Sequence, residues 1–290
     1  MVSYVSKLAL GASQFRFEGA ATHPRARTPQ AEIAEIIAVG ARSGVAILDA
    51  AVPFDSGEAI IGAAPNLHSY RLLVRAARAD KGPEHVEAEA RASLARLGVA
   101  RAEAIIVQNA GELFGRCGPD LWDKLLDLKE QGLFEKIGVV ALASDDPLGI
   151  AKRFHPDIIQ APASLLDQRL LASRTLAAVA DMGVEVHLRS IFLQGLLFLP
   201  PDRMPAPLKG AASSLSRVRR MIAEGRSDPM QAALGFALSR PEASAVIVNV
   251  TSAQELNAMI AAAASPPPEL DWEGMAIDDA AALDHGSAAA

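Results

Sequence analysis

The chain has 290 residues, of which half are hydrophobic and only 4% aromatic, and its formal net charge is −6. This length and composition suit a large α/β core and exclude a disordered or fibrous chain. The negative charge, and the lack of any basic run with interleaved aromatic residues, argue against a general nucleic-acid surface. The single cysteine, Cys117, excludes an internal disulfide and a cysteine-based zinc site, and no cluster of residues has metal-ligand spacing.

The N-terminal segment MVSYVSKLALG lacks the basic start and long apolar stretch of a signal peptide. No uninterrupted apolar segment reaches about 18 residues, the length that a membrane-spanning helix needs. A lone thiol also fits a reducing compartment. We therefore expect a cytoplasmic protein that binds neither a membrane nor nucleic acid.

Short β-branched runs alternate along the chain with amphipathic stretches of about a dozen residues, the pattern of parallel strands that return through helices. The predicted strands are residues 7–12, 45–50, 71–76, 104–109, 137–142, 157–162, 184–190 and 245–250. Eight such units in a chain of this length predict a (β/α)8 TIM barrel. A doubly wound sheet is the rival fold, but the chain contains no G-x-G, so the dinucleotide fingerprint of that fold is absent.

Proline at the first helical position marks the start of several predicted helices, because its missing N–H would be unpaired there in any case. The predicted starts are at Pro29, Pro83, Pro147 and Pro229. We expect a single barrel over residues 1–265 with an insertion at about 199–225 that contains an extra helix. Residues 266–290 are expected to form a C-terminal tail with little order.

The active site of such a barrel lies at the carboxyl ends of the strands. The side chains expected there are polar and partly cationic. They are Gly11, Ala12, Asp49, Phe54, Arg75, Gln108, Asn109, Val140, Gln160, Arg189, Ser190 and Asn249.

Several segments, in this order, resemble signatures of the aldo-keto reductase family: LALGASQF, ILDAAVPFDSGEAIIG, SLARLGV, LKEQGLFEKIGV and HLRSIFLQGLL. The resemblance runs from about residue 7 to 262 and is strongest to a bacterial subgroup associated with cell-surface carbohydrate pathways. It implies a barrel that binds NADPH or NADH and reduces a carbonyl group. The family does this with an aspartate, a tyrosine that supplies the proton, a lysine that lowers the pKa of the tyrosine, and a histidine that orients the carbonyl.

Carried over position by position, only one residue of that tetrad is retained. Asp49 matches the aspartate, whereas Phe54 stands in place of the tyrosine, Arg75 in place of the lysine and Gln108 in place of the histidine. Phe54 has no titratable atom and cannot donate a proton, and the charge of Arg75 is not tunable. Gln108 can still donate a hydrogen bond to a carbonyl. The resemblance therefore implies that binding survives better than acid catalysis.

The residues expected to bind the cofactor also include both retained and replaced family positions. By resemblance, Gln160 would hold the nicotinamide amide, and Ser190 with Gly195 would contact the pyrophosphate. Arg189 occupies the position of the aromatic residue that stacks on the nicotinamide.

At the adenine end, Ser252 matches the serine that follows strand eight. Thr251 replaces the basic residue that often contacts the 2′-phosphate of NADP.

Two functions follow from these residues. The first is an aldo-keto-reductase-like protein for a small, carbohydrate-like ligand, with carbonyl reduction weak, altered or lost, unless Glu18 or His23 of the first βα loop replaces the missing acid. The alternative is a non-redox binding protein for an anionic, sugar-like ligand, which would be held by Arg16, Arg75 and Arg189 together with Gln108.

Overall fold

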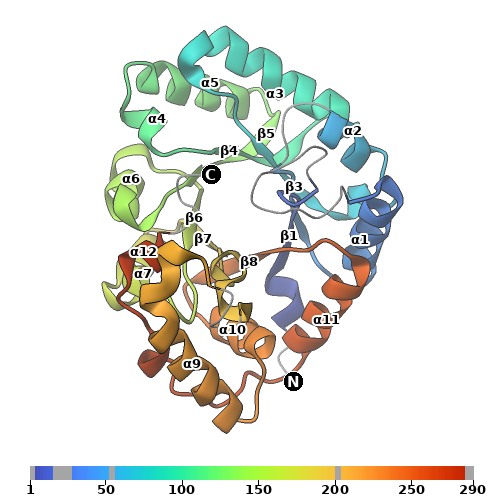
Figure 1. Cartoon of the computed structure of the whole chain (residues 1–290). Coiled ribbons are helices and arrows are strands. Elements are labelled where there is room, and N and C mark those ends of the chain that lie inside the picture. Colours follow the sequence, from blue (N-terminus) through green and yellow to red (C-terminus); the bar gives the residue numbers. More distant parts are fainter. Residues whose placement is uncertain (1–3, 16–27, 52–55, 200–203, 285–290) are drawn as a thin grey trace.

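The computed structural model describes residues 4–15, 28–51, 56–199 and 204–284. Eight parallel strands are each hydrogen-bonded to the next, and β8 also pairs with β1, which closes the barrel (Figure 1). The strands are β1 (Leu8–Gly11), β2 (Ile47–Asp49), β3 (Arg71–Arg75), β4 (Ala102–Val107), β5 (Phe134–Val140), β6 (Ile158–Pro162), β7 (Glu185–Arg189) and β8 (Ala243–Asn249). The predicted (β/α)8 barrel is confirmed, and every strand overlaps its predicted range.

Helices surround the barrel, as Figure 1 shows. Those of the barrel wall are α1 (Gln30–Arg42), α2 (Ser56–Gly62), α3 (Pro83–Leu97), α5 (Gly118–Glu130), α6 (Pro147–Phe154), α8 (Thr175–Asp181), α10 (Pro229–Leu238) and α11 (Ala253–Ala264). Shorter or additional helices are α4 (Gly111–Phe114), α7 (Arg169–Ala172), α9 (Ala212–Glu224) and α12 (Ala280–Leu283). Three of the predicted proline starts are helix starts, and α1 begins one residue after Pro29. Asp146 and Asp228 cap α6 and α10 by accepting backbone N–H bonds.

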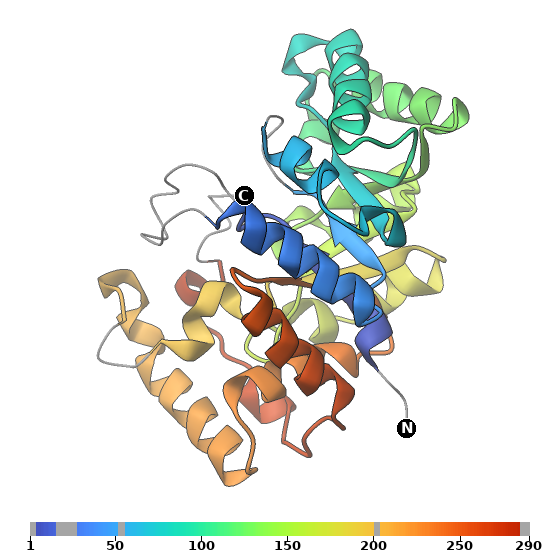
Figure 2. The same cartoon turned by 90° about the vertical axis from the view of Figure 1, so that its right-hand side faces the viewer.

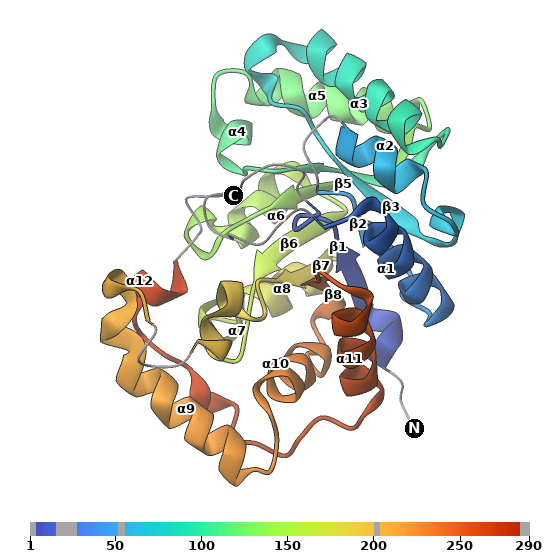
Figure 3. The same ribbon diagram turned by 45° about the vertical axis from the view of Figure 1, so that its right-hand side comes forward.

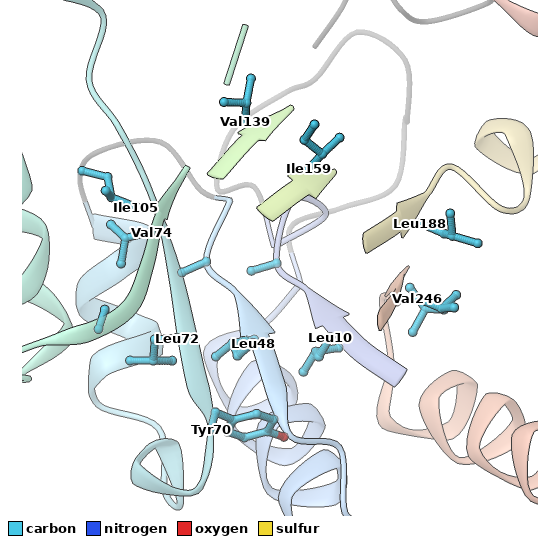
Figure 4. Packing of buried hydrophobic residues seen from close by; sticks show 14 of the residues in the cluster. Leu10, Leu48, Tyr70, Leu72, Val74, Ile105, Val139, Ile159, Leu188 and Val246 are labelled. Carbon is cyan, nitrogen blue, oxygen red and sulfur yellow. The ribbon is translucent and has the colours of Figure 1, made fainter. Parts of the chain in front are cut away.

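The strands are apolar on both faces because the barrel is packed inside and covered outside. Outward-facing residues such as Leu48, Val74 and Val139 belong to the layer between strands and helices (Figure 4). Residues of alternate position form a separate interior cluster. It consists of Ala9, Ile47, Leu73, Ala104, Ile106, Val140, Ile158, Ala245 and Ile247. This cluster fills the middle of the barrel, so polar chemistry is left to the residues above and below it.

A second apolar core lies to one side of the barrel, where α9 runs beside the C-terminal segment (Figures 2 and 3). Leu215 and Ile222 of α9 belong to the same buried cluster as Met275, Ile277 and Leu283. The extra helix expected in the insertion is therefore α9. The expectation of a poorly ordered tail was wrong for residues 266–284, because their apolar side chains complete this core.

No helix in the described ranges combines the length and the hydrophobicity needed to cross a membrane.

Candidate active site

Asp49, Arg75 and Gln160 meet inside the carboxyl end of the barrel. They lie two residues beyond Ile47, Leu73 and Ile158 of the interior cluster. Because side chains alternate along a strand, they point inward in the layer directly above that cluster. The sequence thus places three polar side chains from β2, β3 and β6 in one buried layer.

These three side chains form a closed triangle of hydrogen bonds. Arg75 Nη2 donates to Asp49 Oδ2 at 2.7 Å, and Arg75 Nη1 donates to Gln160 Oε1 at 3.2 Å. Gln160 Nε2 donates to the same Asp49 Oδ2 at 3.0 Å. The side chains of Asp49 and Arg75 are only 2% and 8% exposed, so this is a buried ion pair bridged by an amide.

The triangle leaves some hydrogen-bonding capacity unused. Within the described part of the chain, Asp49 Oδ1 and Arg75 Nε are buried and have no hydrogen-bond partner. Gln160 retains one N–H and one lone pair on its amide, because each group makes a single bond in the triangle. The three side chains therefore retain hydrogen-bonding capacity, although Gln160 itself is fully buried.

Arg189, the last residue of β7, adds a second positive charge to this layer. Strands β3 and β7 lie opposite each other in the closed eight-stranded barrel, so Arg75 and Arg189 approach from opposite walls. Burial and the charge of Arg75 lower the pKa of Arg189, and Asp49 opposes this shift. Arg189 Nη1 is buried and has no hydrogen-bond partner among the described residues.

Not every expected residue joins the triangle. Gln108 lies just past the end of β4 and is half-buried, and no hydrogen bond of its side chain is found within the described residues. Phe54, Arg16, Glu18 and His23 lie outside the described residues.

The chain that follows β7 turns sharply. Ser190 and Leu193 have φ angles of 58° and 44°, and Gly195 has 89°. A side chain at Gly195 would meet no atom of the described residues within 4 Å, so the backbone there is open to a ligand. The N–H groups of Leu193 and Gly195 donate within the turn, to Ser190 O and Phe192 O.

The N-terminus of α11 is occupied by acidic side chains. Ser252 caps the helix by accepting from Glu255 N at 3.1 Å, and Thr251 N donates to Glu255 Oε2 at 2.8 Å. Glu32 of α1 accepts from Ala253 N at 2.6 Å. Sequence reasoning singled out Ser252 but missed both glutamates. The only available signals were their positions in the first turns of α1 and α11, which also suit an ordinary helix start.

His187, which the sequence suggests is an ordinary strand residue, is fully buried and stands beside Gln160 in the β6–β7 register. Its nearest charged neighbour is Glu185, with Nε2 and Oε2 3.5 Å apart. Its location inside the barrel follows from alternation along β7, because Arg189 and Glu185 share its face.

The fold has clear counterparts among solved structures. The holo form of the aldo-keto reductase AKR11C1 from Bacillus halodurans has a TM-score of 0.73 at 18% identity, covering 93% of this chain and 90% of that chain. Its apo form has a TM-score of 0.70 at 17% identity, with the same coverage. A protein from Pseudomonas aeruginosa assigned as an aldo-keto reductase has a TM-score of 0.66 at 16% identity, covering 89% of both chains. At sequence identities this low, the similarity to these structures is evidence for a shared fold and for nothing more.

No curated protein matches the chain. The family model described as Aldo/keto reductase family matches residues 7–277, which include all eight strands and the layer of Asp49, Arg75 and Gln160. The chain therefore belongs to the aldo-keto reductase family.

Proposed function

We propose that this protein binds a nicotinamide cofactor at the carboxyl end of the barrel and that its carbonyl reductase activity is weak or altered compared with that of a complete family tetrad. The proposed ligand is a small, carbohydrate-like molecule. The observation that carries the proposal is the closed triangle of Asp49, Arg75 and Gln160.

The triangle matters for acid catalysis because it uses both terminal nitrogens of Arg75 as hydrogen-bond donors. In the family, a lysine at this position is implied to lower the pKa of a tyrosine. Here both terminal nitrogens of Arg75 donate within the triangle, to Asp49 and Gln160. With both terminal nitrogens donating in this way, Arg75 is not arranged to relay a proton to a ligand. Since Phe54 carries no proton either, the chain lacks the usual acid, whose contribution is about 10²- to 10⁴-fold in rate.

The residues present fit a nicotinamide cofactor better than they fit acid catalysis. When bound, such a cofactor supplies a hydride to a carbonyl carbon. Gln160, although fully buried, has hydrogen-bonding capacity left for the carboxamide, and the space beside Gly195 leaves room for the pyrophosphate. Arg189 contributes a positive charge beside that loop. These residues would bind and orient the cofactor, while no described side chain replaces the missing acid.

The acidic N-terminus of α11 favours NADH over NADPH. A helix N-terminus attracts anions, but here Glu32 and Glu255 already accept the N–H groups of Ala253 and Thr251. The two carboxylates would repel a 2′-phosphate, whereas a carboxylate can accept a hydrogen bond from a free ribose 2′-hydroxyl. The threonine at position 251 offers no compensating charge.

Calorimetric titration with NADH and NADPH tests the proposal. We expect NADH to bind at micromolar concentration and NADPH to bind more weakly. Glu32→Gln should strengthen NADPH binding and so reduce the difference in affinity between NADH and NADPH. Glu35→Gln, on the exposed face of the same helix, is the control and should leave that difference unchanged. If neither cofactor binds the wild type, the proposed function is wrong. If NADPH binds more tightly than NADH, the argument from α11 is wrong.

A further inference from the structure

The charges in the mouth of the barrel do not balance. Asp49 and Arg75 neutralise each other in a buried pair, with Arg75 Nη2 2.7 Å from Asp49 Oδ2. Arg189 is the third charged side chain acting in this layer, and it is influenced by both members of the pair. The described part of the layer therefore carries one positive charge in excess, and that charge belongs to Arg189.

The excess charge lies where water cannot easily compensate it. Arg189 Nη1 is buried and unpartnered within the described residues. Arg189 as a whole is half-buried, but a buried donor without a partner, such as its Nη1, is unfavourable, and native structures nearly always pair such a group. The charge of Arg75 across the barrel adds to this cost, and the charge of Asp49 opposes it. Among the described residues no carboxylate pairs with Nη1, and an oxyanion of a bound ligand would complete the arrangement.

We propose that Arg189 binds an oxyanion, a carboxylate or phosphate group of a small ligand in the mouth of the barrel, and thereby selects anionic ligands. This inference deepens the proposed function and rests on it for the location of the ligand site. A planar guanidinium matches both kinds of oxyanion, because it can donate two parallel hydrogen bonds.

Arg75 is not the anion-binding residue. Its Nη1 and Nη2 both donate within the triangle, and its charge is already compensated by Asp49. An anion drawn to Arg75 would also approach the carboxylate of Asp49. Of the two described arginines that the sequence places at the mouth, Arg189 alone combines an unused nitrogen of the fork with an uncompensated charge.

The oxyanion has two chemical sources, the cofactor and a second ligand. D-gluconate and D-sorbitol form a matched pair of probes, since they have the same chain length and differ in the carboxylate. Inorganic phosphate and NADH represent the phosphate source. We expect wild-type protein to bind gluconate or phosphate at low salt and to bind sorbitol at least about tenfold more weakly.

Arg189→Gln should weaken oxyanion binding about tenfold or more, and Arg189→Lys should weaken it less, because lysine keeps the charge and loses the fork. Arg220→Gln is the matched control, since Arg220 is exposed on α9 and the substitution changes the net charge equally. Thermal unfolding checks the fold, and we expect Arg189→Gln to be no less stable than the wild type.

Titration of NADH-saturated protein separates the two sources. Gluconate binding that persists with NADH present assigns the oxyanion to a second ligand. Competition between NADH and the probes, together with weaker NADH binding in Arg189→Gln, assigns it to the cofactor.

The proposal is overturned if Arg189→Gln binds the probes and NADH as the wild type does, or if the wild type binds none of them. Arg189-dependent binding of gluconate without NADH binding would support an anion site and reject the proposed cofactor.

Discussion

Arg75 donates from Nη2 to Asp49 Oδ2 at 2.7 Å, and Gln160 bridges the same two side chains. The pair joins β2 to β3, and the bridge reaches across the barrel to β6. Asp49 is thus held in a buried ion pair with Arg75, and Gln160 contacts both side chains.

The buried pair makes stability sensitive to the loss of either partner. Asp49→Asn should lower the free energy of unfolding by about 3–5 kcal/mol, because the charge of Arg75 would remain buried without a counter-charge. The measurement is urea unfolding followed by circular dichroism. The double variant Asp49→Leu with Arg75→Met should recover much of the loss, since it buries no charge. Equal stability of Asp49→Asn and the wild type would contradict a buried ion pair.

The opposite end of the barrel carries a second charged network with a pH signature. Lys136 Nζ lies 2.7 Å from Glu185 Oε1 and 2.6 Å from Glu103 Oε1. The neighbouring His187 and Lys136 lower the pKa of Glu185 from 4.5 to about 2, although burial opposes them. A carboxylate with a depressed pKa stabilises the fold above its unfolded pKa, and this stabilisation is lost as the pH falls toward the folded pKa.

Glu185→Gln should therefore be less stable than the wild type at neutral pH, and the difference should shrink as the pH falls below about 4.5. Urea midpoints measured from pH 7 to about pH 3 follow this change. Glu269→Gln, at an exposed loop position, serves as the control and should match the wild type throughout. A stability difference between Glu185→Gln and the wild type that stays constant down to pH 3 would show that the charge of Glu185 does not stabilise the fold.

The barrel was predictable because its signals are repetitive. Eight β-branched runs and prolines at helix starts such as Pro83 and Pro147 each mark local structure, and alternation along β2, β3 and β6 places Asp49, Arg75 and Gln160 inside. Of the contacts among them, the pair of Asp49 with Arg75 was predictable from their opposite charges, but the bridge by Gln160 was not. That Gln160 bridges Asp49 and Arg75 depends on side-chain geometry across the barrel, which no local pattern encodes.

The C-terminal segment was misjudged for a related reason. Residues 266–284 contain prolines, acidic residues and alanines, which are typical of a poorly ordered terminus. Only a few large apolar side chains mark its packing. Met275, Ile277 and Leu283 are buried because α9, an insertion outside the barrel repeat, supplies the surface that they cover. Contacts between an insertion and a terminus follow no sequence period.

This packing predicts that the segment contributes to stability. Met275 is fully buried, so Met275→Ala should lower the free energy of unfolding by about 2–5 kcal/mol. Met182→Ala is the matched control. Because Met182 is 40% exposed, this substitution should lower the free energy of unfolding far less. Denaturant unfolding of both variants checks the comparison. If Met275→Ala costs no more than Met182→Ala, residues 266–284 do not form part of the folded core in solution.

The proposed weakness of acid catalysis can be tested by introducing a tyrosine at position 54. We expect the double variant Phe54→Tyr with Arg75→Lys to reduce a small aldehyde with NADH about 10²- to 10⁴-fold faster than the wild type, the range that a positioned general acid contributes. Phe54→Tyr alone should gain less, because Arg75 donates both terminal nitrogens within the triangle and cannot tune a phenol. Arg75→Lys alone should not increase the rate of reduction, since it supplies no proton donor to the carbonyl.

The pH dependence of kcat provides a second readout: the double variant should lose activity as the new phenol deprotonates, and the wild type should show no such step. Wild-type turnover that equals that of the double variant would mean that another group, outside the triangle, already supplies the proton.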